Sequence, residues 1–203
     1  MMLGSCFAED VGNLLKRSML ALCINPFGTL YNPRSIAQSL RRLMADLPFS
    51  ADELVAYGNL WHSMSHHSRF SSVDKDRALQ KINAAYAEGV ACLRSARHLI
   101  VTFGTAYTFS TADGETVANC HKMPASMFNR RMLSTNEIAD RMDSVNRRHP
   151  QIQSPHRHHV HRKSSAPPCR RRPWQPIEQI HAAACRRQDH GATPRRVPLL
   201  SIV

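Results

Sequence analysis

The chain of 203 residues lacks the features that define several well-known classes of protein. No two of its six cysteines form a Cys-x-x-Cys pair, so neither a zinc ribbon nor a disulfide framework is indicated. It has no run of 18 apolar residues and no charged segment leading into an apolar stretch, so we expect neither a membrane span nor an export signal. Free thiols in a reducing compartment fit this pattern. We therefore predict a cytoplasmic protein without a membrane partner.

Charge and proline are distributed unevenly along the chain. Residues 146–203 hold 12 of the 27 Lys and Arg residues, but only 2 of the 15 Asp and Glu residues. The same segment holds 8 of the 12 prolines and shows no sustained apolar period. We predict a folded domain over residues 1–145, followed by a disordered basic tail over residues 146–203.

The stretch around which the chain is organised is residues 3–9, LGSCFAE. An apolar entry leads to Gly4, then to two side chains that can act as nucleophiles, Ser5 and Cys6, and then to an amphipathic helical pattern. This order predicts a strand end, a tight turn and a helix start, where backbone N–H groups and the helix dipole favour a developing oxyanion. The plainer alternative is a small-residue turn without a catalytic role.

The remaining patterns predict an alternation of helices and strands. A buried strand over residues 98–103 ends at Gly104, and a hairpin over residues 107–117 turns at Asp113 and Gly114. Helical spacing of apolar residues is found over residues 8–22, 36–47, 51–57, 74–97 and from 134 onward. Ser35 is a candidate N-cap, and Ser50 with Glu53 and Ser134 with Glu137 have the spacing of capping boxes. Helix, strand and glycine turn in this order favour an α/β fold with a parallel sheet, with ligand chemistry at the carboxyl ends of its strands.

A polar and aromatic segment over residues 61–71 contains three histidines, which raises the question of a metal site. No carboxylate lies at ligand spacing, and the adjacent His66 and His67 cannot both face one point on a helix. We predict no metal and no cofactor.

Four motifs in this order resemble those of the bacterial GSCFA domain family, which is grouped with the SGNH (GDSL-like) hydrolases. They are residues 3–9 (LGSCFAE), 25–33 (NPFGTLYNP), 103–106 (FGTA) and 118–122 (ANCHK), and the resemblance covers residues 3–145. It implies an incomplete SGNH-like α/β/α sandwich with a parallel sheet. It also implies that the intact protein hydrolyses an ester, with an acylated carbohydrate as the candidate substrate.

The resemblance also suggests roles for individual residues. In SGNH-like enzymes the nucleophile is the serine of a Gly-x-Ser motif. Aligning Gly4-Ser5-Cys6 with this motif places Cys6 at the nucleophile position, and the neighbouring Ser5 is the alternative nucleophile. Gly28 and Asn119 are candidate oxyanion donors, and Gly104 is a further candidate beside the substrate.

His121 and His67 are the best candidates for a base, although each could equally line the substrate or serve the structure. The glycines could equally serve turn dihedrals, and Asn119 could satisfy a loop. The late Asp-x-x-His of the superfamily is absent, since no Asp lies three residues before a His. We therefore predict negligible esterase activity for this chain.

The basic tail has two alternative interpretations. It could be an arm that binds nucleic acid through phosphate contacts, in a non-catalytic binding protein. We favour a one-nucleotide frameshift near codon 146, because residues 163–168, 173–179 and 199–203 read in the shifted frame can encode SPVRH, HGNQLSK and YFPSYE. These strings resemble the continuation of the family. This hypothesis makes the chain a truncated member of the family, makes nucleic acid an unlikely partner, and leaves the strands of the domain without neighbours. Independently of it, residues 1–3 are too short for a complete central strand, so we expect the N-terminus to be incomplete.

Overall fold

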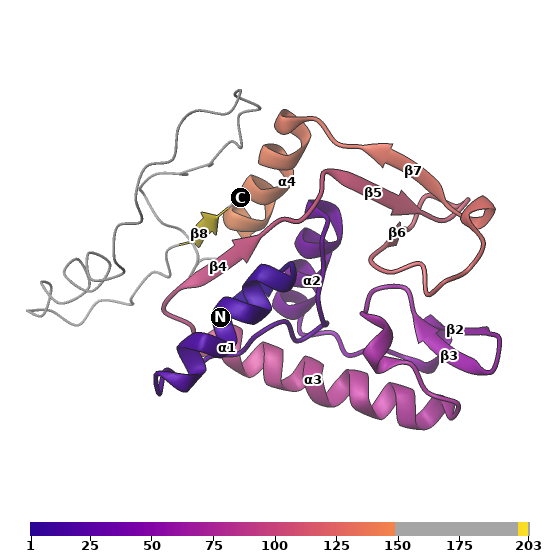
Figure 1. Ribbon diagram of the computed structural model, residues 1–203, viewed down its shortest axis with the longest axis horizontal. Helices are drawn as coiled ribbons and strands as arrows, with labels where there is room; N and C mark the ends of the chain where they lie inside the picture. The colour runs from indigo at the N-terminus through magenta and orange to yellow at the C-terminus, as the bar shows by residue number, and fades with distance from the viewer. Residues whose placement is uncertain (149–198, 203) are drawn as a thin grey trace, which may run out of the picture.

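A computed structural model describes residues 1–148 and 199–202 of the chain (Figure 1). In this part of the chain four α-helices alternate with short strands and three single turns of 3₁₀-helix. The elements, in chain order, are β1 (Met2–Gly4), α1 (Cys6–Arg17), α2 (Pro33–Ala45), η1 (Ala51–Glu53), β2 (Leu54–Tyr57), β3 (Leu60–Ser63), η2 (Ser68–Phe70), α3 (Lys75–Ser95), β4 (Leu99–Thr102), β5 (Tyr107–Ser110), β6 (Thr116–Val117), η3 (Ala125–Met127), β7 (Asn129–Met132), α4 (Thr135–Arg148) and β8 (Leu199–Ile202).

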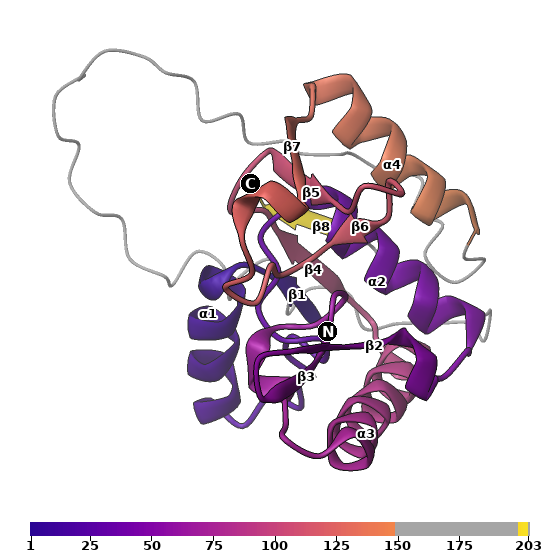
Figure 2. The same cartoon turned by 90° about the vertical axis from the view of Figure 1, so that its right-hand side faces the viewer.

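A parallel sheet lies at the centre of the fold. Its strand order is β1-β4-β8, and Leu3 of β1 is paired with Val101 of β4. Figure 2 shows α1 on one side of this sheet and α2 and α3 on the other. The predicted α/β fold with a parallel sheet is therefore confirmed.

Alternation of side chains along the strands explains why helices cover both faces. Leu3, Leu99 and Val101 belong to one buried cluster together with apolar residues of α2 and α3, such as Ile36 and Ile82. Successive residues of a strand point to opposite faces, so Met2, which is also buried, lies on the face covered by α1. A strand whose two faces are both covered has a nearly continuous apolar sequence, and this is the pattern from which the buried strand over residues 98–103 was predicted.

Two small antiparallel sheets accompany the parallel one. β2 pairs with β3, and β5 lies between β6 and β7. The predicted hairpin over residues 107–117 is confirmed, and Gly114 takes a φ of 82° in its turn. β7 was not predicted, because Asn129–Met132 carries two arginines and is exposed throughout.

Several predicted helix boundaries were wrong. α1 begins at Cys6 and ends at Arg17 rather than at residue 22, because Met19 takes a left-handed φ of 64°. Residues 51–57 do not form one helix. The capping box between Ser50 and Glu53 is present, but the chain leaves the helical path after a single 3₁₀ turn, since Leu54–Tyr57 pairs with β3.

The caps of the other helices follow side-chain chemistry. Asn32, not the predicted Ser35, caps α2, because its Oδ1 accepts the Ser35 N–H at 2.8 Å. Asp74 caps α3 by accepting the Arg77 N–H. The predicted capping box of α4 is confirmed: Ser134 N donates to Glu137 Oε2, and Glu137 N donates to Ser134 Oγ.

The structure corrects one expectation for the basic tail. Leu199–Ile202 forms a strand that pairs in parallel with β4, so the sheet does gain a neighbour from this segment. Four largely apolar residues can satisfy the open N–H and C=O groups of the β4 edge. α4 also continues across the predicted boundary at Asn146 to Arg148. The other predictions for the tail concern residues outside the described ranges.

Over residues 1–148 and 199–202, none of the helices has the length and apolar character needed to cross a membrane.

We expect Gly4→Ala to lower the free energy of unfolding by at least about 3 kcal/mol. Gly4 has a φ of 136°, and a Cβ there would overlap the carbonyl oxygen of Thr102. Gly58→Ala is the matched control, because Gly58 also has a positive φ, of 58°, but has no heavy atom within 4 Å of the added carbon. The control should cost only about 1 kcal/mol in urea denaturation. Equal losses for the two variants would contradict the proposed close contact.

Candidate active site

The candidate nucleophiles lie where β1 passes into α1. Ser5 is the N-cap of α1, in extended conformation, but its side chain makes no capping hydrogen bond. Instead, Ser5 Oγ lies 2.9 Å from Thr102 Oγ1 at the end of β4, and Ser5 N donates to the same Thr102 oxygen at 3.0 Å. Ser5 is 5% exposed, so this hydroxyl pair is largely shielded from water.

Cys6 is the first residue of α1, and its thiol is free and exposed. Among the described residues, no acceptor is bonded to the backbone N–H of Cys6 or Phe7. Both donors belong to the first turn of α1, where unpaired N–H groups and the helix dipole create a positive potential. The turn therefore combines a hydroxyl, a thiol and two open backbone donors.

Asn25 and Leu30 fix this turn from a third segment of chain. Gly4 N donates to Asn25 Oδ1 at 2.8 Å, and Leu30 N donates to Gly4 O at 2.8 Å. Asn25 is completely buried in a left-handed conformation, and its Nδ2 has no partner among the described residues. Sequence reasoning missed Asn25 and Thr102. For Thr102, the available signal was its position as a polar residue at the end of the apolar run that forms β4.

Gly104 lies directly beside Ser5. A Cβ at Gly104 would come within 3.4 Å of Ser5 Cβ and 2.6 Å of Tyr31 Cδ1. The N–H of Gly104 donates to Tyr31 O at 2.8 Å. The absence of a side chain at Gly104 thus allows Tyr31 and Ser5 to pack closely against it, and the structure brings Ser5, Cys6 and Gly104 together.

Gly28 and His67 contact each other in a neighbouring turn. A Cβ on Gly28, whose φ is 81°, would overlap the Cβ of His67. The N–H of Gly28 donates to Asn25 O at 2.7 Å, so this predicted oxyanion donor already has an acceptor. His67 caps η2, and its Nδ1 accepts the Arg69 N–H.

Asn119 and His121 form a separate turn. Asn119 Oδ1 accepts the His121 N–H at 2.9 Å, and His121 has a left-handed φ of 50°. His121 Nε2 lies 2.8 Å from Ser63 O, and since a carbonyl only accepts, this nitrogen carries the proton. The remaining nitrogen, Nδ1, is buried without a partner among the described residues. Burial lowers the pKa of His121.

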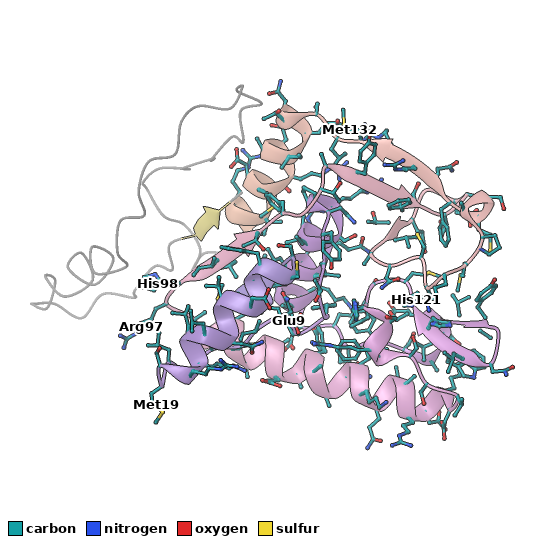
Figure 3. All side chains as sticks on the ribbon, viewed as in Figure 1. Glu9, Met19, Arg97, His98, His121 and Met132 are labelled. Carbon is teal, nitrogen blue, oxygen red and sulfur yellow. The ribbon has the colours of Figure 1, made fainter. Side chains whose placement is uncertain are left out.

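No hydrogen bond within residues 1–148 connects Ser5 Oγ or the Cys6 thiol to a histidine or a carboxylate. Figure 3 shows His121 well apart from Glu9, which belongs to the first turn of α1. Glu9 itself accepts a hydrogen bond from Thr29 Oγ1 at 2.5 Å and lies 3.5 Å from the Arg69 guanidinium. The described site therefore has nucleophiles and donors, but its histidines and its nearest acid are engaged elsewhere.

Two of the three histidines of residues 61–71, His62 and His66, are buried. His66 stacks on Phe27 with ring centroids 4.8 Å apart and meets Phe49 and Phe70 edge-on. His62 Nδ1 lies 2.7 Å from Ser71 Oγ. Over the described residues there is no group of three or more His, Cys, Asp or Glu side chains that could hold a metal ion.

Comparison with known proteins gives one match. The model of the GSCFA family matches residues 1–159, which is more than half of the chain and includes every candidate residue. The match extends past Asn146 into residues that the structure does not describe. No curated protein and no solved structure matches the chain.

We expect Thr102→Val to lower the free energy of unfolding by about 1–3 kcal/mol, because it leaves the buried Ser5 hydroxyl without its partner. The loss should be smaller in a Ser5→Ala background, where no hydroxyl is left unpaired and the backbone N–H of residue 5 can still donate to Thr102 O. Urea denaturation of the two single variants and the double variant measures this coupling. Equal losses in both backgrounds would show that the hydroxyl pair contributes nothing specific.

Stability should also fall as the pH is lowered below about 6.5. Burial, followed by the positive charge of His121, lowers the pKa of His66 to about 3. The unfolded chain, with an ordinary histidine, takes up a proton below pH 6.5, whereas folded His66 stays neutral until about pH 3. From pH 7 to 5 this difference should cost roughly 2 kcal/mol.

The variant His66→Phe keeps an aromatic ring at this position and removes the titrating group. Urea midpoints measured at pH 7 and 5 should differ less in this variant than in the wild type. An unchanged pH dependence would contradict a neutral buried His66, whatever the absolute stability of the variant.

Proposed function

Since the chain belongs to the GSCFA family, we propose that it carries the nucleophile half of an ester-hydrolase site of the SGNH type. The observation that supports this most is the position of Ser5. It is the N-cap of α1, at the carboxyl end of a parallel strand, yet its hydroxyl is not used for capping. Ligands of α/β proteins bind at this edge of the sheet.

We assign attack on the ester carbonyl to Ser5 rather than to Cys6. Ser5 lies at the junction itself, held by β4 through Thr102. Cys6 lies within α1, and its side chain faces solvent. Attack by Ser5 Oγ would form a tetrahedral intermediate whose oxyanion needs donors near the same turn.

The open N–H groups of Cys6 and Phe7 are the best placed donors for that oxyanion. The Ser5 N–H is already bonded to Thr102, and the Gly28 N–H to Asn25. Asn119 keeps its Nδ2 without a hydrogen bond to a described residue, which makes it a third possible donor. The dipole of α1 would add to the stabilisation of negative charge.

The described part of the chain does not supply a base for Ser5. Ser5 Oγ forms its hydrogen bond with Thr102 Oγ1, and a threonine hydroxyl does not take up a proton at neutral pH. We propose that the frame of the gene is shifted near codon 146 and that the intact frame encodes the Asp-x-x-His which completes the site. The substrate class proposed is an acyl ester, such as an acylated carbohydrate.

We expect the chain with the restored frame to hydrolyse p-nitrophenyl acetate on the order of 10³-fold faster than its Ser5→Ala variant. Cys6→Ala in the same background should retain most of the activity, because the thiol faces solvent. A restored chain that is inactive although folded, or one that loses activity with Cys6→Ala but not with Ser5→Ala, would contradict the assignment.

The chain of 203 residues should itself show no Ser5-dependent turnover. Steady-state hydrolysis of the same ester should be equal, within about twofold, for the chain and its Ser5→Ala variant, since loss of the base removes most of the rate. Turnover that disappears with Ser5→Ala in the present chain would show that a base exists elsewhere.

A further inference from the structure

Two hydrogen bonds attach the turn over residues 118–122 to the end of the β2–β3 hairpin. Ala118 N donates to Met64 O at 2.7 Å, and His121 Nε2 donates to Ser63 O at 2.8 Å. The described residues provide no other hydrogen bond between this turn and the hairpin. Figure 3 shows His121 where the chain that follows β6 approaches the hairpin. The turn is therefore held by one backbone contact and one titratable side chain.

The structure holds His121 as a neutral ring. Since Nε2 carries the proton of that ring, a second proton would have to bind at Nδ1, which is buried and has no partner among the described residues. His121 is 7% exposed, so the new N–H would lack both a protein acceptor and free access to water. Protonation would therefore place an unpaired donor and an unpaired charge in a buried position, which is unfavourable.

The groups around His121 do not compensate such a charge. They are, from β3 and the turn that follows it, His62, His66 and His67, and, from the turn of His121 itself, Cys120 and Lys122. The ring centroids of His62 and His121 are 4.5 Å apart, and the nitrogens of His62 lie close to Ser71 Oγ, at 2.7 Å, and Tyr57 O, at 3.3 Å. Over the described residues, no carboxylate is hydrogen-bonded to or paired with any of these histidines. Burial lowers the pKa of His121, and the positive charges of His62 and His67 add to this effect, against the opposing effect of its bonded carbonyl.

The backbone of this turn is unfavourable without its contacts. His121 and Lys122 both have left-handed φ values, of 50° and 61°. Residues with a Cβ rarely adopt this conformation, and it persists where surrounding contacts hold it. Within the turn, Asn119 Oδ1 accepts the His121 N–H at 2.9 Å, which leaves the bond from His121 Nε2 as the side-chain contact that ties the turn to β3. Weakening this bond therefore favours release of the turn.

We propose that His121 acts as a pH-sensitive latch, whose protonation below about pH 6.5 releases the 118–122 turn from β3 while the rest of the domain stays folded. The closed turn disfavours the proton, whereas in the open turn His121 is an ordinary histidine in water. The open form therefore binds the proton more tightly, and its population rises as the pH falls. His66 takes no part in the release, because its ring is stacked on Phe27 in the core. Release would also move Asn119; that this withdraws an oxyanion donor rests on the proposed function, but the release itself does not.

Hydrogen exchange of the Ala118 amide, followed by NMR in the full chain, tests the latch. Its protection factor, which corrects for the intrinsic pH dependence of exchange, should fall by about 5- to 30-fold from pH 7.5 to pH 5, and about 30-fold is the full effect of one histidine with an ordinary pKa in the open turn. The amide of Ile82, buried in the middle of α3, reports unfolding of the whole domain and should be better protected than that of Ala118 at both pH values. Equal protection of the two amides would mean that the turn opens only by global unfolding, and would overturn the proposal.

Two variants locate the effect. His121→Gln keeps an N–H that can donate to Ser63 O but cannot be charged, so the protection factors of Ala118 at the two pH values should then agree within about twofold. His98→Gln is the matched control, because His98 is an exposed histidine that precedes β4, and it should behave as the wild type. A pH dependence that survives in His121→Gln, or one that is lost in His98→Gln, would contradict the latch.

A measurement on the wild-type chain decides the case in which Gln fails to reach Ser63 and the turn of the variant is open at both pH values. The ring of His121 should titrate in NMR spectra with a pKa below 6.5, and at neutral pH it should carry its proton on Nε2. A ring that titrates at 6.5 or above, or that carries its proton on Nδ1 at neutral pH, would overturn the proposal. No step depends on ester hydrolysis, so an inactive Ser5 leaves these tests unaffected.

Discussion

The close approach of Gly4 to the end of β4 is the contact on which the rest of the structure depends. Because Gly4 has no side chain, the carbonyl of Thr102 can lie against its Cα and accept the N–H of Ser5 at 3.2 Å. The N–H and C=O of Gly4 are bonded in turn to Asn25 and Leu30. One residue thus joins β1 and β4 to the loop that leads into α2, and it sets the direction in which α1 begins.

The same contact holds Ser5 in place, whereas the described residues bring no base to its hydroxyl. Ser5 and its backbone are fixed by groups within the first 102 residues, all of them brought together by β1 and β4. A triad needs a base at the same edge of the sheet. Among the described histidines, His66 is packed among aromatic rings and His121 donates to Ser63. In the function we propose, the base therefore comes from outside the described residues.

The sequence predicted the elements whose signal is local. The apolar run of β4, the long periodic helix α3 and the capping box of α4 each depend on residues a few positions apart, and each was located correctly. The capping box at Ser50 predicted a helix that tertiary pairing of β2 with β3 cuts to one turn. Ser5 and Cys6 were found from their motif. Asn25 and Thr102 were missed as members of the site, because they act on Gly4 and Ser5 across 21 and 97 residues of chain, a separation with no periodic signal.

The charges at the start of α2 are arranged unlike those of the other helices. A helix that begins Pro33-Arg34, with no acid in its first turn, is less stable by itself than one that begins with Asp or Glu. The Asn32 side chain, which accepts the Ser35 N–H at 2.8 Å, and the burial of Ile36 in the core therefore have to stabilise α2 in place of a favourable charge at its start.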